Sequence, residues 1–289
     1  MDGNDLGRRL AVAGVGIPCG VMVVYLGVWS VGVALSIVAA IGVREVYLIA
    51  GASGWRPFQS LGIIASALLV LSAAWTANLA VWSIAAVTIV LGLSLVALVS
   101  AVFYRGPGDR PLASVATTIL GVVYVGVTLS FAVHLRGFPG VADGGIGWDG
   151  ALILIFPLTV TWVGDSVAYF SGHRWGRTKL IPSVSPGKTV VGAAGGLLGA
   201  MVTATLFAGF LINPHTGAVL PWLSAAVVGL IVGCVSQVGD LAESLLKREA
   251  CVKDSGTLFP GHGGVLDRFD SIFFSLPVTY VLFHFLLEP

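Results

Sequence analysis

Residues 189–239 read TVVGAAGGLLGAMVTATLFAGFLINPHTGAVLPWLSAAVVGLIVGCVSQVG, a stretch without any Asp, Glu, Lys or Arg. Its middle contains Asn213, Pro214, His215 and Pro221, residue types that favour turns and end helices. A helix needs about 20 apolar residues to cross the roughly 30 Å hydrocarbon core of a bilayer, and each flanking part has about that length. The stretch therefore predicts two membrane-spanning helices joined by a turn.

The whole chain has a similar composition. Its 289 residues are 56% hydrophobic and 10% charged, whereas soluble proteins carry roughly 25% charged residues. The net charge of +1 implies no bulk attraction to nucleic acid. Cys19, Cys234 and Cys251 have no disulfide or metal-ligand spacing, so we interpret them as packing residues. We exclude a soluble, secreted or disordered protein and predict an all-α, polytopic integral membrane protein.

The same length criterion divides the chain into about nine transmembrane helices. Residues 10–43 carry no charge and are too long for a cleaved signal peptide, so we divide them into two helices with a turn near Trp29 to Gly32. The predicted spans are 10–28, 31–50, 59–76, 81–103, 112–134, 150–172, 189–212, 219–246 and 268–287.

The basic residues test this division. In a nine-helix arrangement, every Lys and Arg except Arg136 falls on the N-terminal side of the membrane. Cytoplasmic loops of membrane proteins collect Lys and Arg. We therefore expect a multi-pass protein of the cell (inner) membrane, with the N-terminus and the active site cytoplasmic and the C-terminus outside.

Charged residues are distributed unevenly along the predicted spans. Residues 1–150 contain little that is polar within their spans besides Asn78 and the Arg44–Glu45 pair, which indicates hydrophobic scaffold helices facing lipid. Residues 151–289 carry acids and bases in helices and cytoplasmic loops, which indicates the catalytic part. We expect the two parts to form a single integral membrane domain.

Acidic side chains inside spans are costly and therefore functional candidates. Asp165 lies in the sixth span and Asp240 and Glu243 lie in the eighth. Gln237, Asp240, Ser244 and Lys247 are spaced i, i+3, i+7 and i+10, so they share one face of a helix. This face must meet a wet cavity or a partner helix; buried ion pairs that fasten helices are the alternative.

The loop before Thr189 contains four basic residues. Gly187-Lys188-Thr189 is similar to the end of a phosphate-binding P-loop, but Pro182 occupies the position that requires glycine. Lys188 remains a candidate for binding phosphate because it stands at a predicted helix start, where N–H groups favour anions. Arg177 and Lys179 are equally well explained as charges that set the topology.

Residues 244–270 combine basic residues, acids, a histidine and glycines. Carboxylates suit hard cations such as Mg²⁺, and the bases suit phosphates. Zinc is disfavoured because Cys251 and His262 are the only soft ligands in the segment. Together the residue types indicate metal-assisted phosphoryl or nucleotidyl transfer.

At these positions the chain resembles the phosphatidate cytidylyltransferase (CDP-diacylglycerol synthase) family. The family signature runs Ser-x-apolar-Lys-Arg, then Lys-Asp, then Pro-x-His-Gly-Gly-x-x-Asp-Arg-x-Asp, and it is matched from Ser244 to Asp270. The strings at 164–169, 185–189 and 237–241 also resemble the family pattern. One departure is Val190-Val191, where the family usually has an aromatic residue and a glutamate.

The resemblance implies transfer of a cytidylyl group from CTP to phosphatidate, within a lipid bilayer, without nucleic acid, and by a chain that could form a homodimer. It implies Mg²⁺ or Mn²⁺ bound by Asp240 and Asp267, with a monovalent cation as a further candidate ion. The implied catalytic residues are Asp165, Asp240, Lys253, Asp254 and Asp267. The implied substrate-binding residues are Ser185, Lys188, Lys247, Arg248, His262, Gly263, Gly264 and Arg268.

Three alternatives use similar groups. A CTP-dependent polyprenol kinase or a synthase for ether-linked lipids would need the same phosphate-binding residues, because the signature does not specify lipid tails. A transporter would also place acids at mid-membrane. The ionisable residues gather at one face rather than crossing the membrane, which disfavours the transporter.

Overall fold

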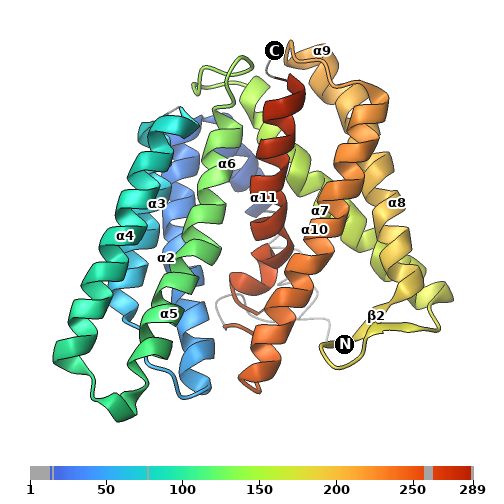
Figure 1. Cartoon of the computed structure of the whole chain (residues 1–289). Helices are drawn as coiled ribbons and strands as arrows, with labels where there is room; N and C mark the ends of the chain where they lie inside the picture. Colours follow the sequence, from blue (N-terminus) through green and yellow to red (C-terminus); the bar gives the residue numbers. More distant parts are fainter. Residues whose placement is uncertain (1–13, 15, 77, 257–262, 288–289) are drawn as a thin grey trace.

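The computed structural model describes residues 14, 16–76, 78–256 and 263–287, and it is a bundle of long, nearly upright helices (Figure 1). Seven of the described helical stretches are long and apolar enough to cross a membrane. They are α2 (Val28–Ala52), α4 (Leu79–Tyr104), α5 (Pro111–Gly121) continued by η2 (Val122–Val127) and α6 (Thr128–Arg136), α7 (Asp149–Trp175), α8 (Val190–Phe207) continued by η3 (Ala208–Ile212) and α9 (Asn213–His215), α10 (Trp222–Glu249) and α11 (Leu266–Leu287).

The other two predicted spans correspond to shorter apolar helices, Gly16–Tyr25 and α3 (Gln59–Trp75). The prediction of a polytopic helical protein is thus supported, whereas nine full-length spans are not. A short 3₁₀ turn, η1 (Pro107–Asp109), joins α4 to α5.

Two predicted turns have different outcomes. The turn between α9 and α10 is confirmed: the Asn213 amide accepts a hydrogen bond from Leu220 N and donates one to Leu220 O, and Pro221 precedes α10. The turn predicted near Trp29 to Gly32 is wrong, because the chain bends at Gly27, where φ is 111°. Residues other than glycine rarely adopt this φ, and a Cβ at position 27 would lie 2.7 Å from Gly144 O.

The loop after α7 is not wholly irregular. It forms an antiparallel hairpin of β1 (Lys179–Ile181) and β2 (Ser185–Thr189), with Lys179 opposite Thr189 and Ile181 opposite Ser185. The other regular elements in the described part of the chain are helical. The hairpin delivers Lys188 and Thr189 directly to the start of α8.

The hairpin marks one end of the bundle, which we call the hairpin end. The loops at 53–58, 105–110 and 250–256 lie at this same end (Figure 1). Arg136 ends α6 at the opposite end, where its side chain donates hydrogen bonds to the carbonyls of Val24, Tyr25, Gly145 and Gly147. Arg136 is only 1% exposed, and its side chain ties together the ends of helices at that end of the described structure.

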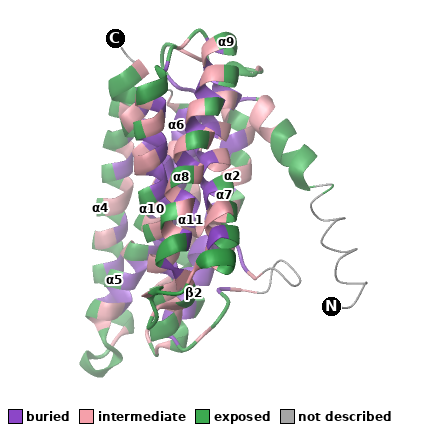
Figure 2. Cartoon of the chain, turned by 90° about the vertical axis from the view of Figure 1, so that its right-hand side faces the viewer, coloured by how far each residue is buried: buried purple, intermediate pink, exposed green. Residues whose placement is uncertain are grey.

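Apolar side chains cover much of the outside of the bundle as well as its interior. Buried residues run along the inside of the helices in Figure 2, and exposed residues lie on their outer faces. Large apolar residues such as Leu95, Val102 and Phe103 of α4 are exposed. An apolar surface of this extent is expected to contact lipid.

Candidate active site

The polar face of α10 meets neighbouring elements, as its spacing predicts. Gln237 Nε2 donates a hydrogen bond of 3.0 Å to Ala193 O of α8. One turn further on, Asp240 accepts a hydrogen bond of 3.4 Å from Ser244 Oγ. The face therefore packs toward α8 at one end and carries charged groups at the other.

Lys188 and Asp240 form the first charged pair of the site. Lys188 Nζ lies 2.8 Å from Asp240 Oδ2, and the two side chains are 25% and 32% exposed. The position of Lys188 is fixed by its neighbour, because Thr189 Oγ1 accepts a hydrogen bond from Gly192 N and caps α8. The sequence prediction that Lys188 stands at a helix start is confirmed.

Lys247 and Asp267, which lies in the first turn of α11, form the second charged pair of the site. Asp267 Oδ1 accepts a hydrogen bond of 2.6 Å from Lys247 Nζ. Its other oxygen accepts bonds from Ser255 N, Ser255 Oγ and Gly264 N, at 2.8 to 2.9 Å. Lys247 also lies 2.6 Å from Glu243 Oε2. With side chains 12% and 10% exposed, Lys247 and Asp267 are held far more rigidly than Lys188 and Asp240.

Two further carboxylates of the site lie on helices that face Asp240. Asp165 of α7, Asp240 of α10 and Asp270 of α11 interact electrostatically with one another, and Lys188 and Lys247 also act on this group. Asp165 thus lies within electrostatic range of Asp240 and Lys188. Asp270 was not among the predicted site residues, although it closes the signature.

Sequence reasoning also missed Glu45, which belongs to α2 in the predicted scaffold. Its buried carboxylate accepts hydrogen bonds from Ser255 Oγ at 2.9 Å, Val265 N at 3.0 Å and Leu266 N at 2.8 Å. Glu45 therefore holds the loop before α11 and caps the start of that helix. The available signal was an acidic residue within an apolar span, next to Arg44.

Gly263 and Gly264, which precede Asp267, must be glycines because carboxylate groups lie very close to their Cα atoms. A Cβ on Gly264 would collide with the Glu45 carboxylate and with Ser255 Oγ, and a Cβ on Gly263, whose φ is 79°, would collide with the Asp267 carboxylate. The structure thus gives these two predicted residues a role in packing around carboxylates.

The remaining predicted residues lie at the edge of the site. Arg248 Nε donates a bond of 3.3 Å to Val184 O, which ties α10 to the hairpin that holds Ser185. Lys253 and Asp254 are exposed in the loop after α10, and Arg268 is exposed in the first turn of α11. His262 lies outside the described residues.

The described carboxylates are of the kind that binds metal ions, but they are not grouped around one position in this structure. Asp165, Asp240, Asp267 and Asp270 offer the hard oxygen ligands that Mg²⁺ prefers. Among the described residues, however, no three His, Cys, Asp or Glu side chains are grouped to hold an ion. Asp240 and Asp267 are each paired with a separate lysine, so a cation that binds either carboxylate would share it with that lysine or displace the lysine.

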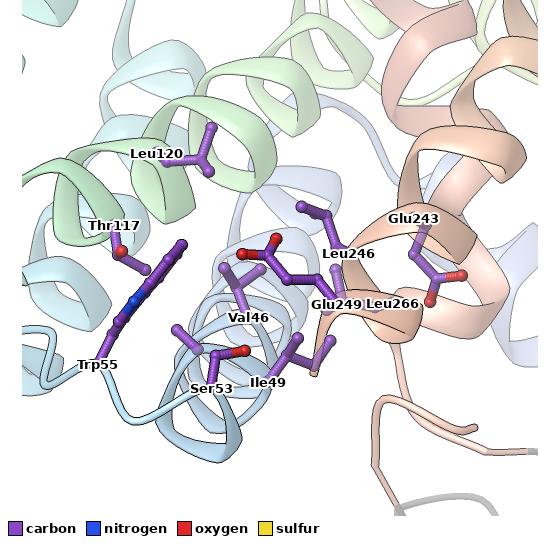
Figure 3. Close-up of a pocket in the computed structure, with 11 residues that line it drawn as sticks. Val46, Ile49, Ser53, Trp55, Thr117, Leu120, Glu243, Leu246, Glu249 and Leu266 are labelled. Carbon is purple, nitrogen blue, oxygen red and sulfur yellow. The ribbon is translucent and has the colours of Figure 1, made fainter. Parts of the chain in front are cut away.

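A small cavity beside α10 is not the substrate site. It measures about 30 Å³ and lies between α2, α5, α10 and α11, with Trp55, Leu120 and Glu249 in its lining (Figure 3). This volume holds about one or two water molecules. The cavity is therefore too small to hold a nucleotide.

Comparison with known proteins agrees with this chemistry. Residues 7–286 match the profile of the cytidylyltransferase family. The chain is 33% identical over 296 aligned positions, covering 94% of both chains, to a phosphatidate cytidylyltransferase of Synechocystis sp.. It is 39% identical to that of Bacillus subtilis over 56% of both chains, and 37% identical to that of Thermotoga maritima over 60% of both. The chain belongs to the cytidylyltransferase family.

Proposed function

We propose that this member of the cytidylyltransferase family transfers the cytidylyl group of CTP to phosphatidate, giving CDP-diacylglycerol and pyrophosphate for phospholipid synthesis. The observation that carries the proposal is the presence of two lysine–carboxylate pairs at the hairpin end, one between β2 and α10 and the other between α10 and α11. The names of the relatives support phosphatidate as the lipid substrate.

In the proposed reaction, a phosphate oxygen of phosphatidate attacks the α-phosphorus of CTP. The bond from this phosphorus to the oxygen that bridges to the β-phosphate breaks, and pyrophosphate leaves with the bonding electrons. The chain lowers the barrier by holding two anionic reactants in line and balancing their charge.

The exposure of the two charged pairs suggests different roles for their lysines. Lys188 is accessible enough to exchange Asp240 for a phosphate oxygen, so we assign it to the triphosphate. Lys247 is enclosed between Glu243 and Asp267. We therefore assign it to holding the end of α10 against the start of α11 around the substrates. Arg248, Lys253 and Arg268 would supply further positive charge at the rim, beside Ser185 and Asp254.

We further propose that Asp240 and Asp267 hold Mg²⁺ or Mn²⁺, close to Asp165 and Asp270. A divalent cation would neutralise the triphosphate and stabilise the departing pyrophosphate. The bound cation would neutralise Asp240 in place of Lys188, which is paired with Asp240 in this structure. Lys188 would then be released to bind phosphate.

Labelled CTP tests the reaction. Purified protein, phosphatidate and Mg²⁺ should incorporate ³²P into lipid from α-labelled CTP and not from γ-labelled CTP. A lipid kinase would give the reverse pattern, and a transporter would label no lipid. Replacing phosphatidate by its ether-linked analogue separates a diacyl-lipid enzyme from an ether-lipid enzyme.

We also propose that the hairpin end faces the cytoplasm, because the basic loops gather there. Cys251 is exposed in the loop after α10. A membrane-impermeant thiol reagent should label it in inverted vesicles and not in intact cells. Cys251→Ser is the control, and labelling of Cys251 from outside intact cells would reverse the proposed orientation.

A further inference from the structure

A second cavity lies among the membrane helices, away from the charged pairs. It measures about 390 Å³ and is lined by the helix Gly16–Tyr25 and by α2, α6, α7 and α11. Its volume falls within the roughly 300–1,000 Å³ of small-molecule sites. Its lining consists of Gly, Ala, Val, Leu, Ile, Trp and Phe residues, so the indole N–H of Trp162 is the one polar side-chain group that the described lining contains.

One end of this cavity adjoins the candidate active site. On α7, the lining residues Ile155, Leu158 and Trp162 form a stripe that Asp165 continues one turn further, about 5 Å along the helix. On α11, Phe269 lines the cavity and Asp270, the next residue, belongs to the carboxylate group of the site. The cavity and the charged groups are therefore successive parts of the same two helices.

We infer that this cavity holds one acyl chain of the lipid phosphate substrate, while the lipid phosphate faces the charged groups of the site beside Asp165 and Asp270. The inference rests on the proposed function and adds the place of the tail. From Leu154 to Trp162 the cavity follows α7 for about 12 Å, which suits an extended hydrocarbon chain. Membrane lipid is as apolar as the lining, so the contribution of the cavity is to orient the headgroup and to select chain length.

Two glycines provide a matched pair of variants. Gly20 lines the cavity, is exposed, and has no atom within 4 Å of a Cβ built on it. Gly92 of α4 is equally exposed and unobstructed, but it lies outside the cavity. Gly20→Phe therefore adds a phenyl ring at the wall of the cavity, and Gly92→Phe adds the same ring elsewhere. Ala34→Phe repeats the obstruction from α2, so that the result does not depend on one helix.

The first measurement compares KM for dioleoyl and dihexanoyl phosphatidate. Gly20→Phe and Ala34→Phe should raise KM for the long-chain lipid about tenfold, because a pocket discriminates strongly against a group that it cannot accommodate. KM for the short-chain lipid and for CTP should change little. Gly92→Phe should behave as wild type. Wild-type KM values and chain-length preference in both cavity variants would overturn the inference.

The second measurement is independent of turnover. Phosphatidate carrying a photoreactive diazirine at mid-chain should crosslink to α7 and α11 between residues 154 and 162 or 269 and 276, and Gly20→Phe should abolish this crosslink. Crosslinks confined to the outer face of α4 would also overturn the inference. If the wild type crosslinks in the cavity but transfers no cytidylyl group, the proposed function fails and the lipid site stands.

Discussion

Residues before and after about 150 use their buried polar groups differently. In the first region, many hydroxyls bond within their own helices, as Ser36 does to Val33 O and Ser130 to Gly126 O, whereas Tyr47 Oη donates to Thr118 O of another helix. In the second region, hydroxyls such as Ser236 also bond within their own helices. Its charged and amide side chains, however, bond between elements, as Gln237 does to Ala193 O and Lys247 to Asp267. The difference teaches that apolar packing positions the first region, whereas the site depends on specific partners.

Glu45 is where the two regions meet. It lies in the first region, but its three hydrogen bonds reach Ser255, Val265 and Leu266 in the second. The predicted division into scaffold and catalytic parts is therefore a hypothesis about which substitutions abolish activity. Glu45 tests it, because Glu45 belongs to the scaffold by sequence but contacts the catalytic part.

The largest effect is expected from the acids of the second region. Asp240→Asn and Asp267→Asn should each lower kcat by about 10²–10³-fold or more, because each removes a charge that balances a lysine and that we assign to metal binding. The double variant should be little worse than either single one, since both belong to one unit. Turnover of wild type should disappear in EDTA and return with Mg²⁺.

Asp109 supplies the matching control from the first region. Its carboxylate lies 3.5 Å from Arg56 Nη1 in an exposed pair, and such pairs contribute about 0–1 kcal/mol. Asp109→Asn should leave kcat unchanged. Near-normal turnover of either Asp240→Asn or Asp267→Asn would show that these carboxylates only pack helices.

Glu45→Gln should have the next largest effect. The amide group of glutamine cannot accept all three hydrogen bonds, so a buried N–H group would lose its partner, at a cost of about 1–3 kcal/mol. We expect kcat to fall about 10- to 100-fold, with KM for CTP nearly unchanged, since Glu45 acts through the position of Asp267. Arg44→Gln, at an exposed position beside it, is the control.

The readouts for Glu45 separate positioning from simple loss of fold. The Glu45→Gln protein should still bind CTP and remain monodisperse in detergent, but it should lose turnover. Equal losses of CTP binding and turnover would instead indicate general unfolding, and an unchanged kcat would confine Glu45 to the scaffold.

Lys188→Met should have a smaller and more specific effect. Methionine keeps most of the apolar side chain but removes the ammonium group, so KM for CTP should rise about tenfold while folding is retained. Lys179→Met is the control, because Lys179 lies on the adjacent strand opposite Thr189 and is exposed. Equal kinetics of the two variants would reduce the Lys188–Asp240 pair to a structural contact.

The sequence predicts the local parts of this site better than their partners. Helical periodicity places Gln237, Asp240 and Ser244 on one face, and the structure has them there. The capped start of α8 is equally local, since Thr189 and Gly192 are three residues apart. Such features depend on residues within one or two turns of a helix.

Pairings over long separations were not predictable in the same way. The sequence groups Asp240 with Asp267, yet Lys188 reaches the first and Lys247 the second. Glu45 and Ser255 are 210 residues apart, so no spacing rule connects them. The bend at Gly27 was misplaced for a related reason, because its unusual φ is stabilised by contact with the distant Gly144.

The smallest effects are expected at two helix caps, one in each region. Asn78 Oδ1 accepts bonds from Ala80 N and Val81 N at the exposed start of α4, and Asn78→Ala should cost about 1 kcal/mol of stability. Thr189→Ala should cost somewhat more, about 1–3 kcal/mol, because the buried N–H of Gly192 then has no water to replace the lost bond. Thermal unfolding in detergent measures both costs, and the KM for CTP separates them: it should rise only in Thr189→Ala, whose cap fixes Lys188. An equal KM in both variants would mean that β2 holds Lys188 without the cap, and that the site is less dependent on specific partners than the comparison of the two regions implies.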